Sequence, residues 1–196
     1  MKLKDYLDLI GAILITVGLL LNWMQMRADH ERARREKAVE YILSWARNVD
    51  RRGTLARKLV ETFSFEQCKS LINQEAFEVG RPKAVLVEGI FGEMPEERDG
   101  KYQLDLSKSA ELRWMVVSYL NNLEAIISGW RHHVADRQII AEQFKFLVSP
   151  SNGHFILEEF RKAAGLDNYP AIEEFAKERK EEYDSASRPK PRRKVA

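Results

Sequence analysis

The 196-residue sequence contains a single cysteine, Cys68, so no disulfide can form within one chain. A lone thiol is more typical of a reducing compartment than of a secreted protein. Glycine and proline are also scarce, at 10 and 6 residues, and no low-complexity tract interrupts the middle of the chain. These features argue against wholesale disorder. At this length, a single domain with its own core is expected.

Motifs that carry chemistry are missing as well. The sequence has no Walker-type phosphate loop, no G-x-S-x-G nucleophile elbow and no dinucleotide-binding fingerprint. The adjacent His132 and His133 would point to different faces of a helix, whereas metal ligands usually recur three or four residues apart. Cys68 is expected to be a buried, small apolar residue. We therefore predict that the protein is not an enzyme and has neither a cofactor nor a metal site.

Charge is absent from residues 9–26, although the whole chain has 32 basic and 30 acidic residues. This run matches the roughly 17–25 apolar residues that cross a hydrocarbon core about 30 Å thick. Apolar residues cover every face of the run, whereas a soluble helix shows one stripe. Tyr6 and Trp23 stand at its ends, where interfacial aromatic residues are common. These features predict a transmembrane helix over residues 6–26, in which Gly11 and Gly18 would let two such helices pack closely.

A cleaved signal peptide is the alternative interpretation of the same run. Lys2 and Lys4 provide a positive start, but Asp5 and Asp8 dilute it. The run ends in NWMQM, residues 22–26, which lacks the pair of small residues at a cleavage site. An uncleaved anchor is therefore favoured.

Basic residues after the run set the expected orientation. Lys2 and Lys4 precede it, and five basic residues follow in a predicted stalk over residues 27–38: Arg27, Arg32, Arg34, Arg35 and Lys37. Because excess Lys and Arg marks the cytoplasmic side, we expect an inner-membrane protein with its N-terminus outside and its C-terminal domain in the cytoplasm. These five residues are candidates for binding anionic lipid. Alternatively, they only stop translocation and solvate the helix.

Residues 39–183 are predicted to form a compact helical domain. A helix over residues 28–48 should dock onto it through a stripe at the spacing i, i+3, i+4 and i+7. The members of this stripe are Val39, Ile42, Leu43 and Ala46. The run Arg51-Arg52-Gly53 should end that helix, and Thr54 should cap the next one.

Further helices are marked by their ends. Ser64 and Gln67 form a capping box ahead of a helix over residues 65–74. Residues 83–91 fit either a strand or a buried helical turn, and residues 92–100 have the composition of an exposed loop.

Three helices should complete the domain toward the C-terminus. Asp136 should cap a helix that ends before Pro150. A helix over residues 155–164 should stop at Gly165. Pro170 should stand in the first turn of the last helix. The predicted fold class is all-α, with at most a small β-hairpin.

The strongest periodic segment is a central helix that Ser107 should cap. Its apolar residues fall within an arc of about 140°: Leu112, Met115, Val116, Tyr119, Leu120, Leu123, Ile126, Ile127 and Trp130. Trp114, Val117 and Ala125 point to the other side, so we expect this helix to be covered on both sides.

Three polar residues within the central helix are candidates for a functional or structural role: Asn121, Asn122 and Glu124. Asn121 falls on the second apolar face, where a buried amide would need hydrogen-bond partners. It could fix the helix register, or the group could contact a partner in a groove.

The run YLNNLEAIISGW, residues 119–130, resembles an uncharacterised family of short bacterial and phage membrane-anchored proteins. In that family an N-terminal span precedes a helical domain of unknown function. Its central helix reads roughly Leu-Asn-x-x-Glu followed by a glycine, which Leu120, Asn121, Glu124 and Gly129 match. The resemblance covers residues 39–178. It implies architecture and not activity, since no catalytic residue comes with it.

The last segment, residues 184–196, combines prolines and basic residues with almost no apolar residue, so it should be disordered. Its basic residues are Arg188, Lys190, Arg192, Arg193 and Lys194. They are candidates for phosphate contacts with lipid or nucleic acid. Alternatively, this segment is a solvated end without a specific role.

Together these patterns predict a single-pass membrane-anchored adaptor or accessory subunit. Its cytoplasmic helical domain would bind a protein partner or a second copy of the chain, and its anchor would contact membrane lipid. The alternative is a membrane-localised effector in phage conflict or stress response that acts on nucleic acid or lipid through the basic segments. A hydrolase with dispersed catalytic residues has no positive support in the sequence.

Overall fold

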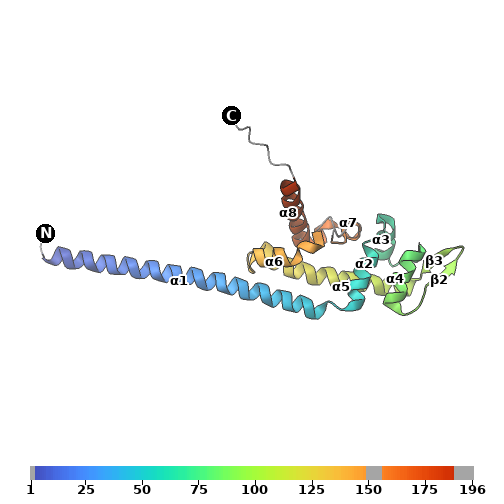
Figure 1. Cartoon of the computed structure of the whole chain (residues 1–196), viewed down its shortest axis with the longest axis horizontal. Helices are drawn as coiled ribbons and strands as arrows, with labels where there is room; N and C mark the ends of the chain where they lie inside the picture. Colours follow the sequence, from blue (N-terminus) through green and yellow to red (C-terminus); the bar gives the residue numbers. More distant parts are fainter. Residues whose placement is uncertain (1–2, 149–155, 188–196) are drawn as a thin grey trace, which may run out of the picture.

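The computed structural model describes residues 3–148 and 156–187, without the side chains of residues 3–9, 12, 183, 184, 186 and 187. The described chain is mainly helical, with a small sheet at the end of the domain far from the N-terminus (Figure 1). This confirms the predicted helical class. The sheet has three strands, one more than the small hairpin that the prediction allowed.

The helices are α1 (Leu3–Asn48), α2 (Arg51–Val60), α3 (Phe65–Ile72), α4 (Arg81–Phe91), α5 (Leu106–Arg131), α6 (Arg137–Phe144), α7 (Glu158–Ala164) and α8 (Pro170–Ser187). The strands are β1 (Phe77–Val79), β2 (Glu96–Arg98) and β3 (Lys101–Leu104). Two short 3-10 helices, η1 (Lys145–Val148) and η3 (Leu166–Asn168), follow α6 and α7.

Helix α1 is 46 residues long and extends far beyond the domain (Figure 1). At 1.5 Å per residue this is about 70 Å. It docks through Ala38, which is fully buried, and through Tyr41 and Trp45. The ring of Trp45 packs edge-on against those of Tyr119 (5.0 Å) and Phe144 (5.5 Å). The aromatic face of α1 therefore faces the core.

The predicted docking stripe of α1 was wrong in register. Val39 and Leu43 are each about half exposed, and Ala46 is exposed too, whereas Ile42 packs against the core. The physical reason is that α5 and α6 offer aromatic partners to Trp45, one position along the chain from Ala46.

Two helix starts differ from the prediction, and both use aspartate. Asp50, not Thr54, caps α2, because its carboxylate accepts the N–H of Gly53 at 2.6 Å. Asp105, not Ser107, caps α5 by accepting the N–H of Lys108 at 2.8 Å. A charged acceptor at a helix start gains from the helix dipole in addition to the hydrogen bond.

Other predicted boundaries are confirmed. Ser64 and Gln67 form the reciprocal capping box of α3. Asp136 caps α6 by accepting the N–H groups of Gln138 and Ile139. Gly165 follows the end of α7, and α8 begins at Pro170.

The ambiguous stretch over residues 83–91 is helical, as part of α4, which begins after Gly80 with Pro82 in its first turn. The following loop contains β2, which pairs antiparallel with β3, and β3 also pairs with β1. Buried side chains from β1 and β3 join the core: Phe77, Val79, Tyr102 and Leu104. The small sheet thus closes one end of the helical domain.

Helix α5 forms the centre of the domain and contacts α1, α2, α3, α6 and α8. Leu112, Leu123 and Trp130 on its main face are fully buried. The prediction that α5 is covered on both sides was wrong. On its second side, Trp114 is 69% exposed and Ala125 is also exposed.

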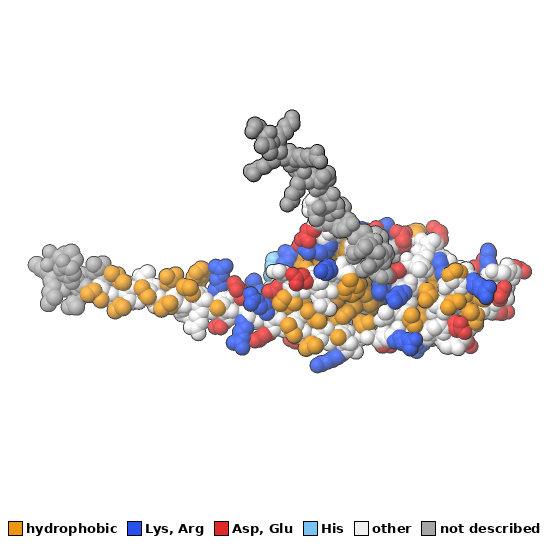
Figure 2. Space-filling view, viewed as in Figure 1, with side chains coloured by type: hydrophobic (Ala, Val, Ile, Leu, Met, Phe, Trp, Pro, Cys, Tyr) orange, Lys and Arg blue, Asp and Glu red, His pale blue; other side chains and the backbone are white. Residues whose placement is uncertain are grey.

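The projecting part of α1 is rich in exposed apolar side chains (Figure 2). These are Ile10, Ile13, Leu14, Ile15, Val17, Leu19, Leu20, Leu21, Trp23, Met24 and Met26. Among the residues whose side chains the structure describes, no helix is long and apolar enough to cross a membrane. The predicted transmembrane helix over residues 6–26 has no support from this finding.

Candidate functional site

Glu124 on α5 joins two helices that lie far apart in the sequence. Its two carboxylate oxygens accept hydrogen bonds from the backbone N–H groups of Ala171 (2.8 Å) and Ile172 (3.0 Å). These N–H groups lie in the first turn of α8, where a helix supplies no acceptor of its own and carries partial positive charge. Glu124 therefore caps α8 from a position 47 residues upstream of Ala171.

Arg161 of α7 reinforces this junction. It is 2% exposed, its Nε donates to the carbonyl of Ile156 at 2.7 Å, and its guanidinium pairs with Glu173 in the first turn of α8. Burial lowers the pKa of Arg161 to about 10, and the charges of Glu158 and Glu124 oppose that shift. The side chain stays cationic at neutral pH. This closed arrangement of polar groups is typical of a structural junction, not of a reaction centre.

Gly129 allows the close approach of α1 to α5. A Cβ built at Gly129 would overlap the ring of Tyr41 on α1. Seven residues later the chain contacts α1 again, where the N–H of Asp136 donates to the carbonyl of Arg34 at 3.0 Å. The glycine of the predicted motif thus has a packing role, and Leu120 of the same motif is fully buried.

The prediction that Asn121 is buried was wrong, because this residue lies on the open side of α5 and is exposed. Asn122 is half-buried and lines a groove of about 130 Å³ between α5 and the junction of α1 with α2. The residues that line it are Asn48, Val49, Asp50, Gly53, Trp114, Met115, Ser118, Tyr119 and Asn122.

Sequence reasoning missed Trp114 as a surface residue. Its position outside the main apolar arc of α5 is the available signal. A residue in that position can either be exposed or be covered by another element, and the prediction favoured the covered case. The structure therefore separates the three polar candidates. Glu124 caps a helix, Asn122 lines a groove and Asn121 faces outward.

The basic residues after the apolar run all lie on α1, and most are paired. Arg32 pairs with Glu36 at 3.0 Å, and Lys37 pairs with Glu40 at 2.8 Å. The hydrogen bond that Lys37 donates to Glu40 raises the pKa of Lys37. Such exposed pairs one turn apart stabilise a helix locally.

The other basic residues of the segment are arranged differently. Arg35 lies 3.8 Å from Asp136, and Arg27 lies 3.6 Å from Glu31. Arg34 has no ion-pair partner among the described residues. The predicted basic residues of the tail lie outside the described residues: Arg188, Lys190, Arg192, Arg193 and Lys194.

Metal-binding side chains do not gather in the described part of the chain. No cluster of three or more His, Cys, Asp or Glu side chains there could hold a metal ion. Cys68 is fully buried, and this burial raises the pKa of its thiol to about 12, so the reactive thiolate is disfavoured at neutral pH. His132 and His133 are exposed in the turn after α5.

These observations define a helical domain carried by one long helix, with structural polar contacts and a shallow groove beside Trp114. Residues 12–149 match a family model described as a domain of unknown function, DUF4760, and the chain belongs to this family. Comparison with curated proteins and with solved structures gives no match. The resemblance to an uncharacterised family is thereby confirmed. The bacterial or phage origin and the membrane anchoring that came with it stay predictions.

Proposed function

We propose that the protein is a single-pass membrane protein whose helical domain serves as an adaptor for a protein partner. The observation that carries this proposal is the exposed apolar end of α1. Eleven large apolar side chains between Ile10 and Met26 are 46–67% exposed. They amount to on the order of 1,000 Å² of apolar surface, whose transfer out of water contributes about 25 kcal/mol. Monomeric soluble proteins rarely expose a patch of this size.

The proposed span comprises residues 9–26, which carry no charge. It includes Leu9 and Ala12, whose side chains the structure does not describe, and the argument at these two positions rests on the sequence alone. The family match begins at residue 12, inside the apolar run, which is consistent with this run being part of the family's architecture. The basic residues that follow favour a cytoplasmic domain.

The proposed partner site is the groove beside Trp114. Tryptophan is enriched in the energetically dominant positions of protein interfaces, and this one is 69% exposed. Its neighbours Ser118 and Asn122 supply polar groups without charge, a combination suited to the apolar side chain of a second polypeptide.

Membrane insertion is tested by alkaline carbonate extraction of cell membranes. The wild-type chain should stay in the pellet. Leu14→Arg with Leu20→Arg should release it, because an arginine near mid-span costs about 2.5–3.5 kcal/mol. Leu14→Phe with Leu20→Phe is the matched control and should stay in the pellet. Release of the wild-type chain would contradict the proposed anchor.

Orientation is tested with reporters fused after Ala196. A reporter that works only in the cytoplasm should be active, and one that requires the periplasm should not. The reverse pattern would place the domain on the opposite side.

Partner binding is tested by crosslinking in intact membranes. Trp114→Ala should lose specific crosslinked products that the similarly exposed control Leu106→Ala retains. Equal products from both variants would exclude the groove as the contact site.

A further inference from the structure

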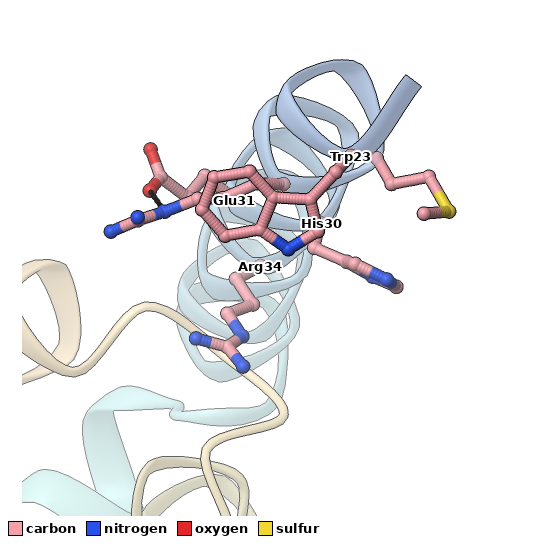
Figure 3. A pocket seen from close by; sticks show the side chains of 6 residues that line it. Trp23, His30, Glu31 and Arg34 are labelled. Atoms are coloured by element: carbon pink, nitrogen blue, oxygen red, sulfur yellow. Dashed lines mark ion pairs between the residues drawn. The ribbon is translucent and has the colours of Figure 1, made fainter. Parts of the chain in front are cut away.

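Arg27 and Arg34 are the two of the five basic residues after the apolar run that line a concavity on α1. Arg27 and Arg34 follow Trp23 at the spacing i+4 and i+11, with His30 between them, so all four lie on one side of the helix. Together with Met26 and Glu31 they line an open concavity of about 570 Å³ (Figure 3). The Arg27 guanidinium lies over the Trp23 ring, 5.8 Å from its centroid.

The pairing of their side chains distinguishes Arg27 and Arg34 from Arg32 and Lys37, which lie outside the concavity. Arg32 and Lys37 are held by carboxylates at 3.0 Å and 2.8 Å. Arg34, by contrast, has no ion-pair partner in the part of the chain that the structure describes. Arg27 lies 3.6 Å from Glu31, and both side chains are more than half exposed. At this separation the pair lacks the hydrogen bond that Arg32 donates to Glu36 at 3.0 Å, so Arg27 can more readily exchange its partner for another anion.

The concavity lies where α1 leaves the domain. The same face of α1 continues into the buried Ala38, and the N–H of Asp136 meets the carbonyl of Arg34. On the other side the concavity is bounded by Trp23, at the end of the exposed apolar run. With residues 9–26 in a bilayer, Arg27 and His30 would lie at the depth of the lipid headgroups.

We propose that this corner binds the phosphodiester of an anionic phospholipid. The inference rests on the proposed membrane anchor and adds the lipid class and the residues that recognise it. The guanidinium groups of Arg27 and Arg34 would donate to the phosphate oxygens, and the His30 ring would supply a further N–H donor. Trp23 would pack beside the glycerol and upper acyl chain, the position that indole rings favour. Two arginines and Glu31 give the face one net positive charge, which matches a monoanionic headgroup.

Native mass spectrometry of the full chain, in micelles doped with equal amounts of phosphatidylglycerol and phosphatidylcholine, measures this preference. The wild-type chain should retain phosphatidylglycerol selectively. Arg27→Gln with Arg34→Gln should reduce that selectivity about 25-fold, since each arginine near a bilayer surface contributes about fivefold. Arg32→Gln with Lys37→Gln removes the same charge from side chains outside the concavity. It should change the selectivity less than about twofold, because neither side chain lines the site and each is already hydrogen-bonded to a glutamate.

Three outcomes would overturn the proposal. One is an equal loss in the two double variants, which would show general attraction between charges. Another is displacement of the lipid by millimolar inorganic phosphate, which would show a site for free phosphate. The third is equal retention of both lipids by a wild-type chain that resists carbonate extraction. This result would refute the lipid site but not the membrane anchor. Release of the wild-type chain by carbonate would instead overturn the anchor itself. Arg27→Lys with Arg34→Lys should give intermediate selectivity, because lysine keeps the charge but lacks the planar fork.

Discussion

Replacing Glu124 by alanine should loosen α8 from the rest of the domain. The substitution removes the acceptor of two backbone N–H groups, those of Ala171 and Ile172, at 2.8 and 3.0 Å. A hydrogen bond to a charged group contributes about 1.5–3 kcal/mol, and loss of a helix cap costs about 0.5–2 kcal/mol. Both figures describe the same contact and are not added; because Glu124 is only partly buried, we expect a loss of about 1.5–2 kcal/mol, where the two ranges overlap.

That loss is a substantial part of the roughly 5–15 kcal/mol that stabilises a typical domain. It should concentrate in α8, whose buried residues Ile172 and Phe175 attach this helix to the core. Urea unfolding of the full chain in detergent measures the change in the free energy of unfolding. Hydrogen exchange should show the largest loss of protection at the amides of Ala171 and Ile172.

Two further variants make the Glu124 prediction specific. Glu124→Gln keeps one carbonyl oxygen as an acceptor, so it should cost about half as much as Glu124→Ala. Asn121→Ala alters the same helix at an exposed position and should stay within about 0.5 kcal/mol of wild type. If Glu124→Ala is no less stable than Asn121→Ala, the capping role is refuted.

Three other predictions concern packing and ionisation. Gly129→Ala should lower the free energy of unfolding in urea by about 1–3 kcal/mol, because the new methyl group displaces the Tyr41 ring. Most of this loss should vanish when Tyr41 is replaced by alanine, and equal losses with and without the Tyr41 ring would refute the contact. Leu123→Ala should leave a cavity at a fully buried site and lower the free energy of unfolding by about 2–5 kcal/mol. Immunoblots should show lower cellular abundance, and unchanged stability and abundance would contradict the assigned core. The pKa of the Cys68 thiol rises from 9.0 to about 12 on folding, so its stabilising contribution is complete below pH 9 and is lost between pH 9 and 12. At pH 10 the loss is about 1.4 kcal/mol, and Cys68→Ala should show a correspondingly smaller fall in unfolding free energy between pH 8 and 10; identical pH slopes would contradict the burial of the thiol.

Features that depend on neighbouring residues could be predicted from the sequence. The capping box at Ser64 and Gln67 and the cap at Asp136 are examples, because donor and acceptor lie within one helical turn. The long α1 is another, since residues 28–48 contain no glycine or proline to end a helix. The caps at Asp50 and Asp105 were missed because Thr54 and Ser107 offered plausible caps only a few residues away.

Features that depend on distant residues could not be predicted in this way. Two apolar stripes run along the domain end of α1, and only the positions of Tyr119, Phe144 and Gly129 decide that Trp45 and Tyr41 face inward. The role of Glu124 has no local signal, since its partners lie 47 and 48 residues downstream.

The groove beside Trp114 could not be predicted from the sequence for the same reason. The period of α5 showed that Trp114 lies off the main face, but it carried no information on whether another element covers that side. Trp114 therefore became a candidate only once the elements were placed in space.

Because α1 is one continuous helix, it fixes the direction in which the domain faces around the helix axis. A flexible linker would let the domain turn freely, whereas a continuous helix ties each added residue to a rotation of about 100° and a rise of about 1.5 Å. One residue inserted near Ala33 would swing the groove at Trp114 to a different side, and seven would return it to nearly the same side about 10 Å farther out. The number of helical residues before Ala38 thus sets both the direction in which the groove faces and its distance from the apolar end of α1.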